Sequence, residues 1–120
     1  MQSRTDAQNA TATEVRSGAT LLKNFKVEQR TTDAPRLFLQ IFNIASPTVG
    51  TDAPEVVIPV PAGSGNFDSA RLGGQFQGNG GGLYLSTALS YAVTTTHDGN
   101  TAPDAGDEPV VILDYEQLGA

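Results

Sequence analysis

Residues Leu83–Val93 read LYLSTALSYAV and show the most regular alternation in the chain. Because successive side chains of a strand point to opposite faces, this alternation predicts a strand. We expect one long strand whose large side chains face a core and whose mostly small side chains face outward. The inward set is Leu83, Leu85, Leu89, Tyr91 and Val93, and the outward set is Tyr84, Ser86, Ala88, Ser90 and Ala92.

Two apolar segments earlier in the chain extend this pattern. Ala19–Thr32 places three large apolar side chains at one parity, which predicts a half-buried strand or a bent pair of strands. They are Leu21, Phe25 and Val27. Arg36–Ile44 reads RLFLQIFNI and is apolar at both parities, so we expect a central strand that is buried on both faces.

Three further segments complete the pattern. Glu55–Pro61 reads EVVIPVP. Because proline cannot donate to a ladder, Pro59 and Pro61 predict an edge strand with the prolines toward solvent. Phe67–Gln77 is weakly patterned, and its expected core residues are Phe67, Leu72 and Phe76. Glu108–Tyr115 reads EPVVILDY and is expected to be the closing strand.

The chain therefore has six or seven short strands with turn residues between them. Its 120 residues suit one domain, and 13 glycines with only 17% charged residues suit strands and turns better than a helical bundle. The predicted fold class is all-β: a small antiparallel β-sandwich or jelly-roll-like barrel. We expect residues 18–120 to form this single β-sandwich domain, with residues 1–17 as an extended N-terminal arm.

Charge separates the predicted arm from the rest of the chain. Residues 1–36 carry six basic and four acidic side chains, a balance of +2, whereas residues 37–120 carry one basic and nine acidic, a balance of −8. The arm has only Met1 and Val15 as large apolar residues, so it needs another surface to order it, and the domain is expected to fold without it. The arm residues expected to contact a partner are Arg4, Val15 and Arg16.

Composition excludes several classes of function. The chain has no cysteine, which excludes thiolate catalysis and a Cys-based metal site. It has a single histidine, His97, which excludes a metal site with several histidine ligands. The net charge of −6 argues against a nucleic-acid partner. No apolar run reaches a membrane span, and the N-terminus lacks the apolar core of a secretory signal. We expect no enzyme activity, no cofactor and no catalytic residue.

Two loops contain residues that suggest chemistry. The stretch 98–108 holds Asp98, Asp104, Asp107 and Glu108, but their spacing does not match an EF-hand. A solvated acidic loop is the favoured interpretation, and whether it binds a cation stays open. His97 beside Asp98 lacks a positioned nucleophile, so we expect an exposed loop histidine. Gly78–Gly82 lacks the Lys-Ser/Thr pair of a phosphate loop and predicts a hairpin.

The outward side of Leu83–Val93 is the main candidate for binding. Tyr84, Ser86 and Ala88 are assigned to a partner contact, because small neighbours let a second sheet or subunit approach closely. The alternative, which the sequence leaves equally open, is that this side faces a second internal layer of the same domain.

Three segments carry a resemblance to a known family. They are PTVGTDAPEVVIPVPAG at Pro47–Gly63, GLYLSTALSYAVT at Gly82–Thr94, and the closing Val111–Tyr115. Over roughly residues 36–116, this chain resembles small virion structural proteins of tailed bacteriophages, and in particular head decoration (cement) proteins.

The resemblance implies a structural role without chemistry. It implies a protein on the outer surface of the capsid that binds the assembled major capsid protein and stabilises the shell through non-covalent contacts and its arm. A homo-oligomer is expected, with a trimer favoured over a dimer. The alternative function is a tail- or fibre-associated β-sandwich module that recognises carbohydrate or a host surface.

Overall fold

The computed structural model describes residues 2–5, 10–68, 82–97, 99–104 and 106–118. Nine strands and no helix lie in these ranges, two or three strands more than the sequence predicts. The strands are β1 Gln2–Thr5, β2 Thr13–Ser17, β3 Thr20–Gln29, β4 Leu37–Phe42, β5 Val56–Val60, β6 Gly65–Asp68, β7 Leu83–Leu85, β8 Ala88–Thr94 and β9 Val110–Gln117.

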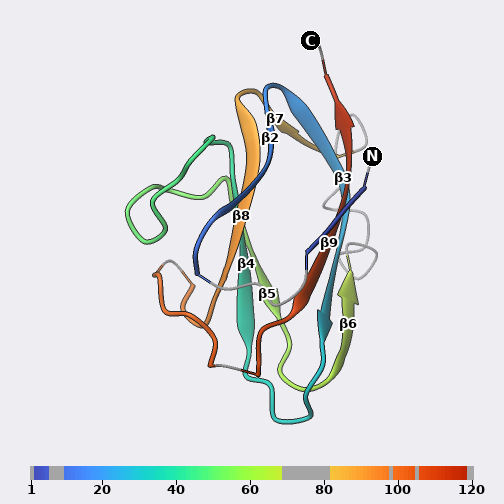
Figure 1. The fold of residues 1–120 in the computed structure, drawn as a ribbon, viewed down its shortest axis with the longest axis vertical. Coiled ribbons are helices and arrows are strands. Elements are labelled where there is room, and N and C mark those ends of the chain that lie inside the picture. Colours follow the sequence, from blue (N-terminus) through green and yellow to red (C-terminus); the bar gives the residue numbers. More distant parts are fainter. Residues whose placement is uncertain (1, 6–9, 69–81, 98, 105, 119–120) are drawn as a thin grey trace.

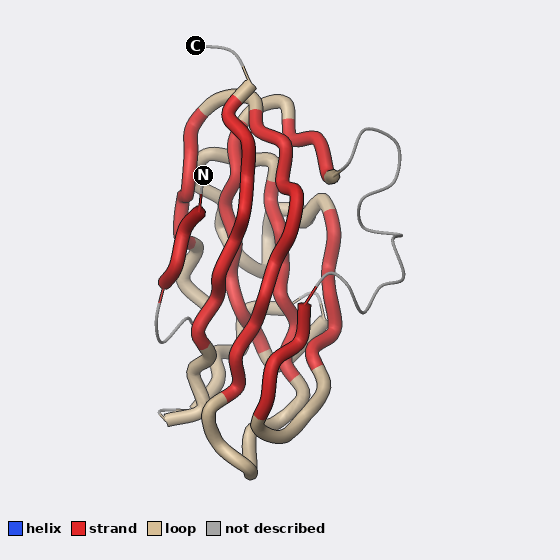
Figure 2. Tube along the Cα trace, turned by 90° about the vertical axis from the view of Figure 1, so that its right-hand side faces the viewer, coloured by secondary structure: helices blue, strands red, loops and turns tan. Residues whose placement is uncertain are grey.

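The strands form two antiparallel sheets that pack face to face (Figure 1). One sheet has the order β1-β9-β3-β6, with β7 also paired to β3, and the other has the order β2-β8-β4-β5. Figure 2 shows the two layers of strands one behind the other. Side chains from both sheets make one core, to which β3, β4 and β8 contribute most. The predicted all-β class is confirmed, whereas the jelly-roll-like connectivity stays a prediction.

The segment that is apolar at both parities forms the predicted central strand. β4 lies between β8 and β5, and Leu37, Leu39 and Ile41 point into the core between the sheets. Its opposite face is also covered, because Gln40 and Phe42 are fully buried. β5 is the predicted edge strand, and its Pro59 is exposed.

The predicted long strand Leu83–Val93 is divided between the two sheets. β7 pairs with β3, and β8, after a corner at Ser86–Thr87, pairs with β2 and β4. The Asn43 side chain fixes this corner, because its Oδ1 accepts the backbone N–H groups of Thr87 (2.7 Å) and Ala88 (3.2 Å). The prediction of one continuous strand is therefore wrong, although the inward assignment of its large residues is confirmed.

A β-bulge changes which residues of β3 face the core. The register between β3 and β9 shifts between Leu22 and Asn24. Because one extra residue reverses the parity, Leu22 is buried with Phe25 and Val27, and Leu21 lies on the outer face. The prediction that Leu21 shares the core face is therefore wrong.

The N-terminal segment supplies one strand to each sheet. β1 pairs with β9, with Arg4 opposite Ile112, and β2 pairs with β8, with Thr13 opposite Tyr91. The surface that orders this segment in the structure is thus its own chain. The predicted boundary at residue 17 stays a prediction, and so does a role of the segment as an arm.

The weakly patterned segment after β5 is described only in part. Phe67 lies in β6 and packs against the core, with its ring 6.0 Å from that of Phe25. Leu72, Phe76 and residues 78–81 of the predicted glycine hairpin lie outside the described residues.

Candidate functional site

Tyr84 is the exposed large hydrophobic residue of the described chain, with 58% of its surface accessible. It lies on β7 opposite Leu21 of β3, which in turn lies opposite Glu116 of β9. Residues paired in this way share a face, so the three side chains form a row across the outer face of the sheet. An aromatic side chain held on paired strands is a good anchor for a protein partner.

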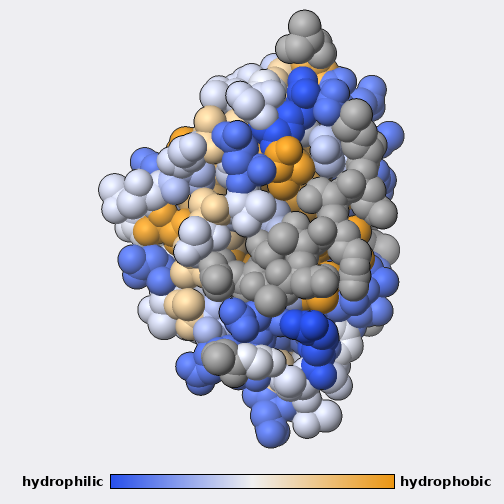
Figure 3. All heavy atoms as spheres, in the orientation of Figure 1, coloured by the Kyte–Doolittle hydropathy of each residue, from blue (hydrophilic) through white to orange (hydrophobic). Residues whose placement is uncertain are grey.

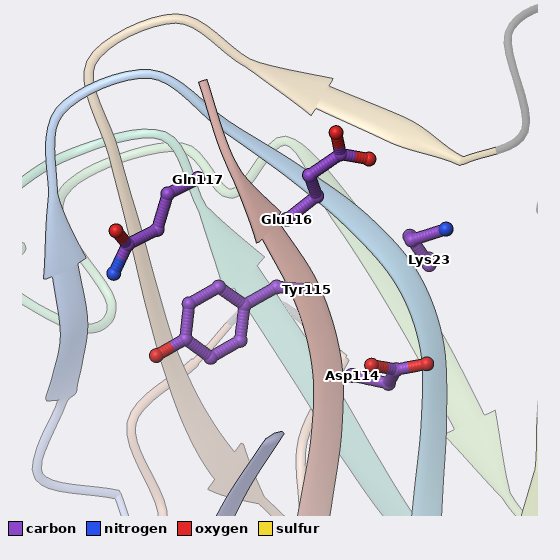
Figure 4. Close-up of a pocket in the computed structure, with 5 residues that line it drawn as sticks. All are labelled: Lys23, Asp114, Tyr115, Glu116 and Gln117. Carbon is purple, nitrogen blue, oxygen red and sulfur yellow. The ribbon is translucent and has the colours of Figure 1, made fainter. Parts of the chain in front are cut away.

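A pocket of mixed charge adjoins this row (Figure 4). Its volume is about 390 Å³, and its lining residues are Lys23, Asp114, Tyr115, Glu116 and Gln117. Figure 4 shows Lys23, Asp114 and Glu116 on one side of β9, with Tyr115 and Gln117 on the other. Asp114 is positioned by Asn24, whose Nδ2 donates to Oδ2 at 3.3 Å.

We call the row and the charged side chains beside it the Tyr84 surface: Leu21, Lys23, Tyr84, Asp114 and Glu116. It combines one aromatic side chain with both signs of charge. Alternation in the sequence points to Tyr84 but not to the other four residues, because only the strand register brings them together. The bulge at Leu22–Asn24 is the step that alternation alone does not reveal.

The outward side of β8 is not exposed to solvent. Ala88 and Ser90 are fully buried, and residues 43–45 lie against this part of the strand. The Ser90 hydroxyl donates to the carbonyl oxygens of Ile44 (2.7 Å) and Ala45 (3.3 Å). The expectation that Ala88 faces a partner is therefore wrong for this structure, since the small side chains admit the chain's own loop. Ser86 stays exposed, and its hydroxyl accepts from Asn43 Nδ2 at 3.1 Å.

The predicted arm contacts also lie against the chain's own body. Val15 is half-buried and packs on the core. Arg16 is half-buried, and its Nε donates weakly to the carbonyl of Ala19 at 3.4 Å. Arg4 occupies a known register position in β1, but its side chain is not among those described.

The PTVGTD stretch of the family resemblance forms a tight, hydrogen-bonded turn. Asp52 Oδ2 accepts the Thr48 N–H at 2.8 Å, and the Asp52 N–H donates to the Thr48 carbonyl at 2.9 Å. Gly50 between them has φ +89°, a conformation that favours glycine. A Cβ on Gly50 would lie 3.1 Å from Asn100 Cβ, so this turn rests on the loop that follows β8. The motif therefore specifies a defined loop shape rather than a catalytic group.

The loop after β8 does not form a metal centre in its described part. Among the described residues no three His, Asp or Glu side chains gather where they could hold a metal ion. Asp107 instead accepts from the Thr31 hydroxyl at 3.0 Å, and Asp98 lies outside the described residues. His97 is exposed, as predicted, and its ring stands edge-on to Phe38 with 5.6 Å between centroids.

Where Figure 3 colours the described residues, polar side chains predominate and apolar residues form small, separate patches. No helix that is long and apolar enough to cross a membrane occurs in the described ranges.

Comparison with known proteins finds no relative: no family model, no curated protein and no solved structure matches this chain. The Tyr84 surface is thus the candidate site that the described geometry favours.

Proposed function

We propose that this chain is a structural virion protein of a tailed bacteriophage, a decoration protein that binds the outer face of the assembled major capsid protein. The resemblance over residues 36–116 suggests the class of partner. The observation that carries the proposal is the exposed aromatic side chain of Tyr84, since the other large hydrophobic side chains of the described residues are buried or half-buried.

Docking on the Tyr84 surface requires no chemistry. Burying the Tyr84 ring removes apolar area from water, and Leu21 beside it adds to the apolar centre. Lys23, Asp114 and Glu116 form a polar rim that sets orientation more than affinity. Such a division between a central anchor and a charged rim is typical of protein interfaces.

The two-sheet body suits a protein that stabilises a shell by contact. β7, which carries Tyr84, is paired with β3, and β3 contributes Leu22, Phe25 and Val27 to the core, so Tyr84 is held on the packed body of the protein. Pro59 on the edge strand β5 limits edge-to-edge association between copies. Because a capsid presents repeated sites, we propose that the protein acts as a homo-oligomer, a trimer rather than a dimer, and that residues 1–17 contribute to its contacts.

The test is co-sedimentation of the purified protein with undecorated, expanded heads of tailed phages. We expect saturable binding that Tyr84→Ala weakens at least tenfold, because truncating an anchor residue costs about 2 kcal/mol or more. The matched control is Asp33→Ala, an exposed turn residue far from β7, which should bind as the unmodified protein does. Absence of binding to heads, with binding to tails or fibres, would support the alternative function instead.

A further inference from the structure

The two carboxylates of the Tyr84 surface form no ion pair with the part of the chain that the structure describes. Glu116 is exposed, and its side chain makes no hydrogen bond with the described residues. Asp114 is half-buried, and only its Oδ2 accepts a hydrogen bond there, from Asn24 Nδ2 at 3.3 Å. The ion pair on this face of the sheet joins Lys26 to Glu28 at 3.5 Å and involves neither carboxylate. Both carboxylates can therefore accept hydrogen bonds from a partner.

The spacing of the two carboxylates fits a guanidinium group. Asp114 and Glu116 are two residues apart on β9, so they share a face and lie about 7 Å apart along the strand. Figure 4 shows both on the side of β9 on which Lys23 lies, and all three line the pocket of about 390 Å³. A guanidinium has five N–H donors in a planar fork and can donate to two carboxylates at once. The ammonium group of lysine has no such fork, so arginine fits this position better.

The charge balance of the pocket favours a single cation. Asp114 and Glu116 with the Lys23 ammonium give its lining a balance of −1, which one guanidinium neutralises. Residues 37–120 as a whole carry a balance of −8, which adds a long-range attraction for a cationic partner. A second cation at the pocket would meet the Lys23 ammonium without a free carboxylate of its own.

The apolar side chains beside the pocket accommodate the rest of such a partner. Leu21 lies next to Glu116 in the row across the sheet, and Tyr84 lies beyond Leu21. Because neighbouring strands are about 4.8 Å apart, this row spans about 10 Å. The methylene stem of an arginine can pack on Leu21 while its guanidinium meets the carboxylates. The Tyr84 ring then remains available to an adjacent apolar side chain of the partner.

We propose that the partner segment that docks on the Tyr84 surface carries an arginine, whose guanidinium binds between Asp114 and Glu116. This inference rests on the proposed function of that surface and adds the chemistry of the partner: one arginine next to an apolar side chain. The charged rim then selects the partner, because a segment without the guanidinium covers two carboxylates and leaves them unpaired.

The test is NMR titration of the ¹⁵N-labelled full chain with two blocked peptides. One is acetyl-Leu-Arg-Leu-amide, and the other has citrulline, the uncharged analogue of arginine, at the central position. We expect the arginine peptide to bind at least threefold more tightly, a modest factor because exposed ion pairs contribute little. Its saturable shifts should include the Asn24 side-chain amide and the backbone of residues 114–117. The preference should shrink in about 0.5 M salt, which screens exposed charges.

Matched variants assign the preference to these carboxylates. Glu116→Gln should remove most of the preference for arginine over citrulline. Glu55→Gln, the same change at an exposed glutamate beside β5 in the other sheet, should leave it intact. Both variants replace an exposed side chain by an uncharged one of the same shape, so both should fold as the unmodified chain does. Asp114→Asn should also reduce the preference, because it removes the charge and keeps an oxygen that can accept from Asn24.

Three results would overturn this inference: no saturable shift with the arginine peptide, equal affinity for the two peptides, or a preference that Glu116→Gln leaves intact. The proposed function is tested separately, by binding to phage heads. Binding to heads without an arginine preference refutes this inference alone. An arginine preference without binding to heads supports the inference for this surface and refutes the proposed function alone.

Discussion

Replacement of Ser90 by valine distinguishes the two interpretations of the outward side of β8. Ser90 is fully buried, and its hydroxyl donates to the Ile44 carbonyl at 2.7 Å and the Ala45 carbonyl at 3.3 Å. Valine removes the donor and places an extra methyl group against the backbone at residues 44–45. If this side of β8 is buried inside the domain, the substitution lowers the free energy of unfolding.

The magnitude follows from two contributions. Loss of the hydroxyl costs about 1–2 kcal/mol, because a net hydrogen bond is lost and a partly buried carbonyl is left unpaired. Overpacking of a close contact adds about 1–3 kcal/mol. The free energy of unfolding should therefore fall by about 2–5 kcal/mol for Ser90→Val, and by about 1–2 kcal/mol for Ser90→Ala, which removes the hydroxyl alone.

Urea unfolding of the purified variants, followed by circular dichroism, measures these differences. Thr87→Val is the control, because the Thr87 side chain is exposed three residues away and Asn43 accepts from its backbone N–H, so the change should alter stability by only about 0.5 kcal/mol. If Ser90→Val unfolds like the unmodified chain but loses binding to phage heads, this side of β8 contacts a partner. The burial of β8 under the chain's own loop would then be refuted.

Three further changes have defined outcomes. Gly50→Ala should lower the free energy of unfolding by about 1–3 kcal/mol, because Gly50 has φ +89° and Asn100 Cβ lies 3.1 Å from the added Cβ; an unchanged urea midpoint would contradict the turn geometry. Pro59→Thr adds a backbone N–H to the edge strand β5 and should raise the rate of aggregation seen by light scattering, whereas an unchanged rate would remove the protective role of Pro59. Deletion of residues 1–17 removes one strand from each sheet and should lower the midpoint of thermal unfolding, so a midpoint equal to that of the full chain would contradict the pairing of β1 and β2.

The elements that alternation predicts correctly are those with strong apolar contrast. β4 carries apolar side chains on both faces because both faces are covered, and this leaves an apolar run, interrupted by the buried Gln40, that the sequence shows directly. β5 is identifiable as an edge because Pro59 cannot donate within a ladder. In both cases a single residue property determines the position of the strand in its sheet.

The elements that the sequence misassigns involve shifts that leave no apolar signature. The corner at Ser86–Thr87 keeps Leu85 and Leu89 on the core side. The alternation of inward and outward residues therefore continues from β7 into β8, although the two strands belong to different sheets. The bulge after Leu22 does the opposite and reverses the parity inside one strand. Neither a corner nor a bulge requires a particular residue here, so alternation alone cannot locate them.

The N-terminal strands show a third limit of predicting the fold from the sequence. β1 and β2 join the sheets chiefly through backbone pairing, which any residue except proline can provide. Their polar composition therefore predicts that the segment needs a surface to become ordered. It does not predict which surface the segment packs against. The Tyr84 surface is predictable in the same partial sense, because the aromatic residue is visible and its neighbours across the sheet are not.

The most direct test of the central claim is cryo-electron microscopy of undecorated, expanded phage heads saturated with the protein. The account predicts additional density at regular lattice positions, into which the two-sheet body fits with Tyr84 facing the capsid and the β5–β6 connection facing outward. Heads without additional density, or bodies bound through the opposite end, would contradict it.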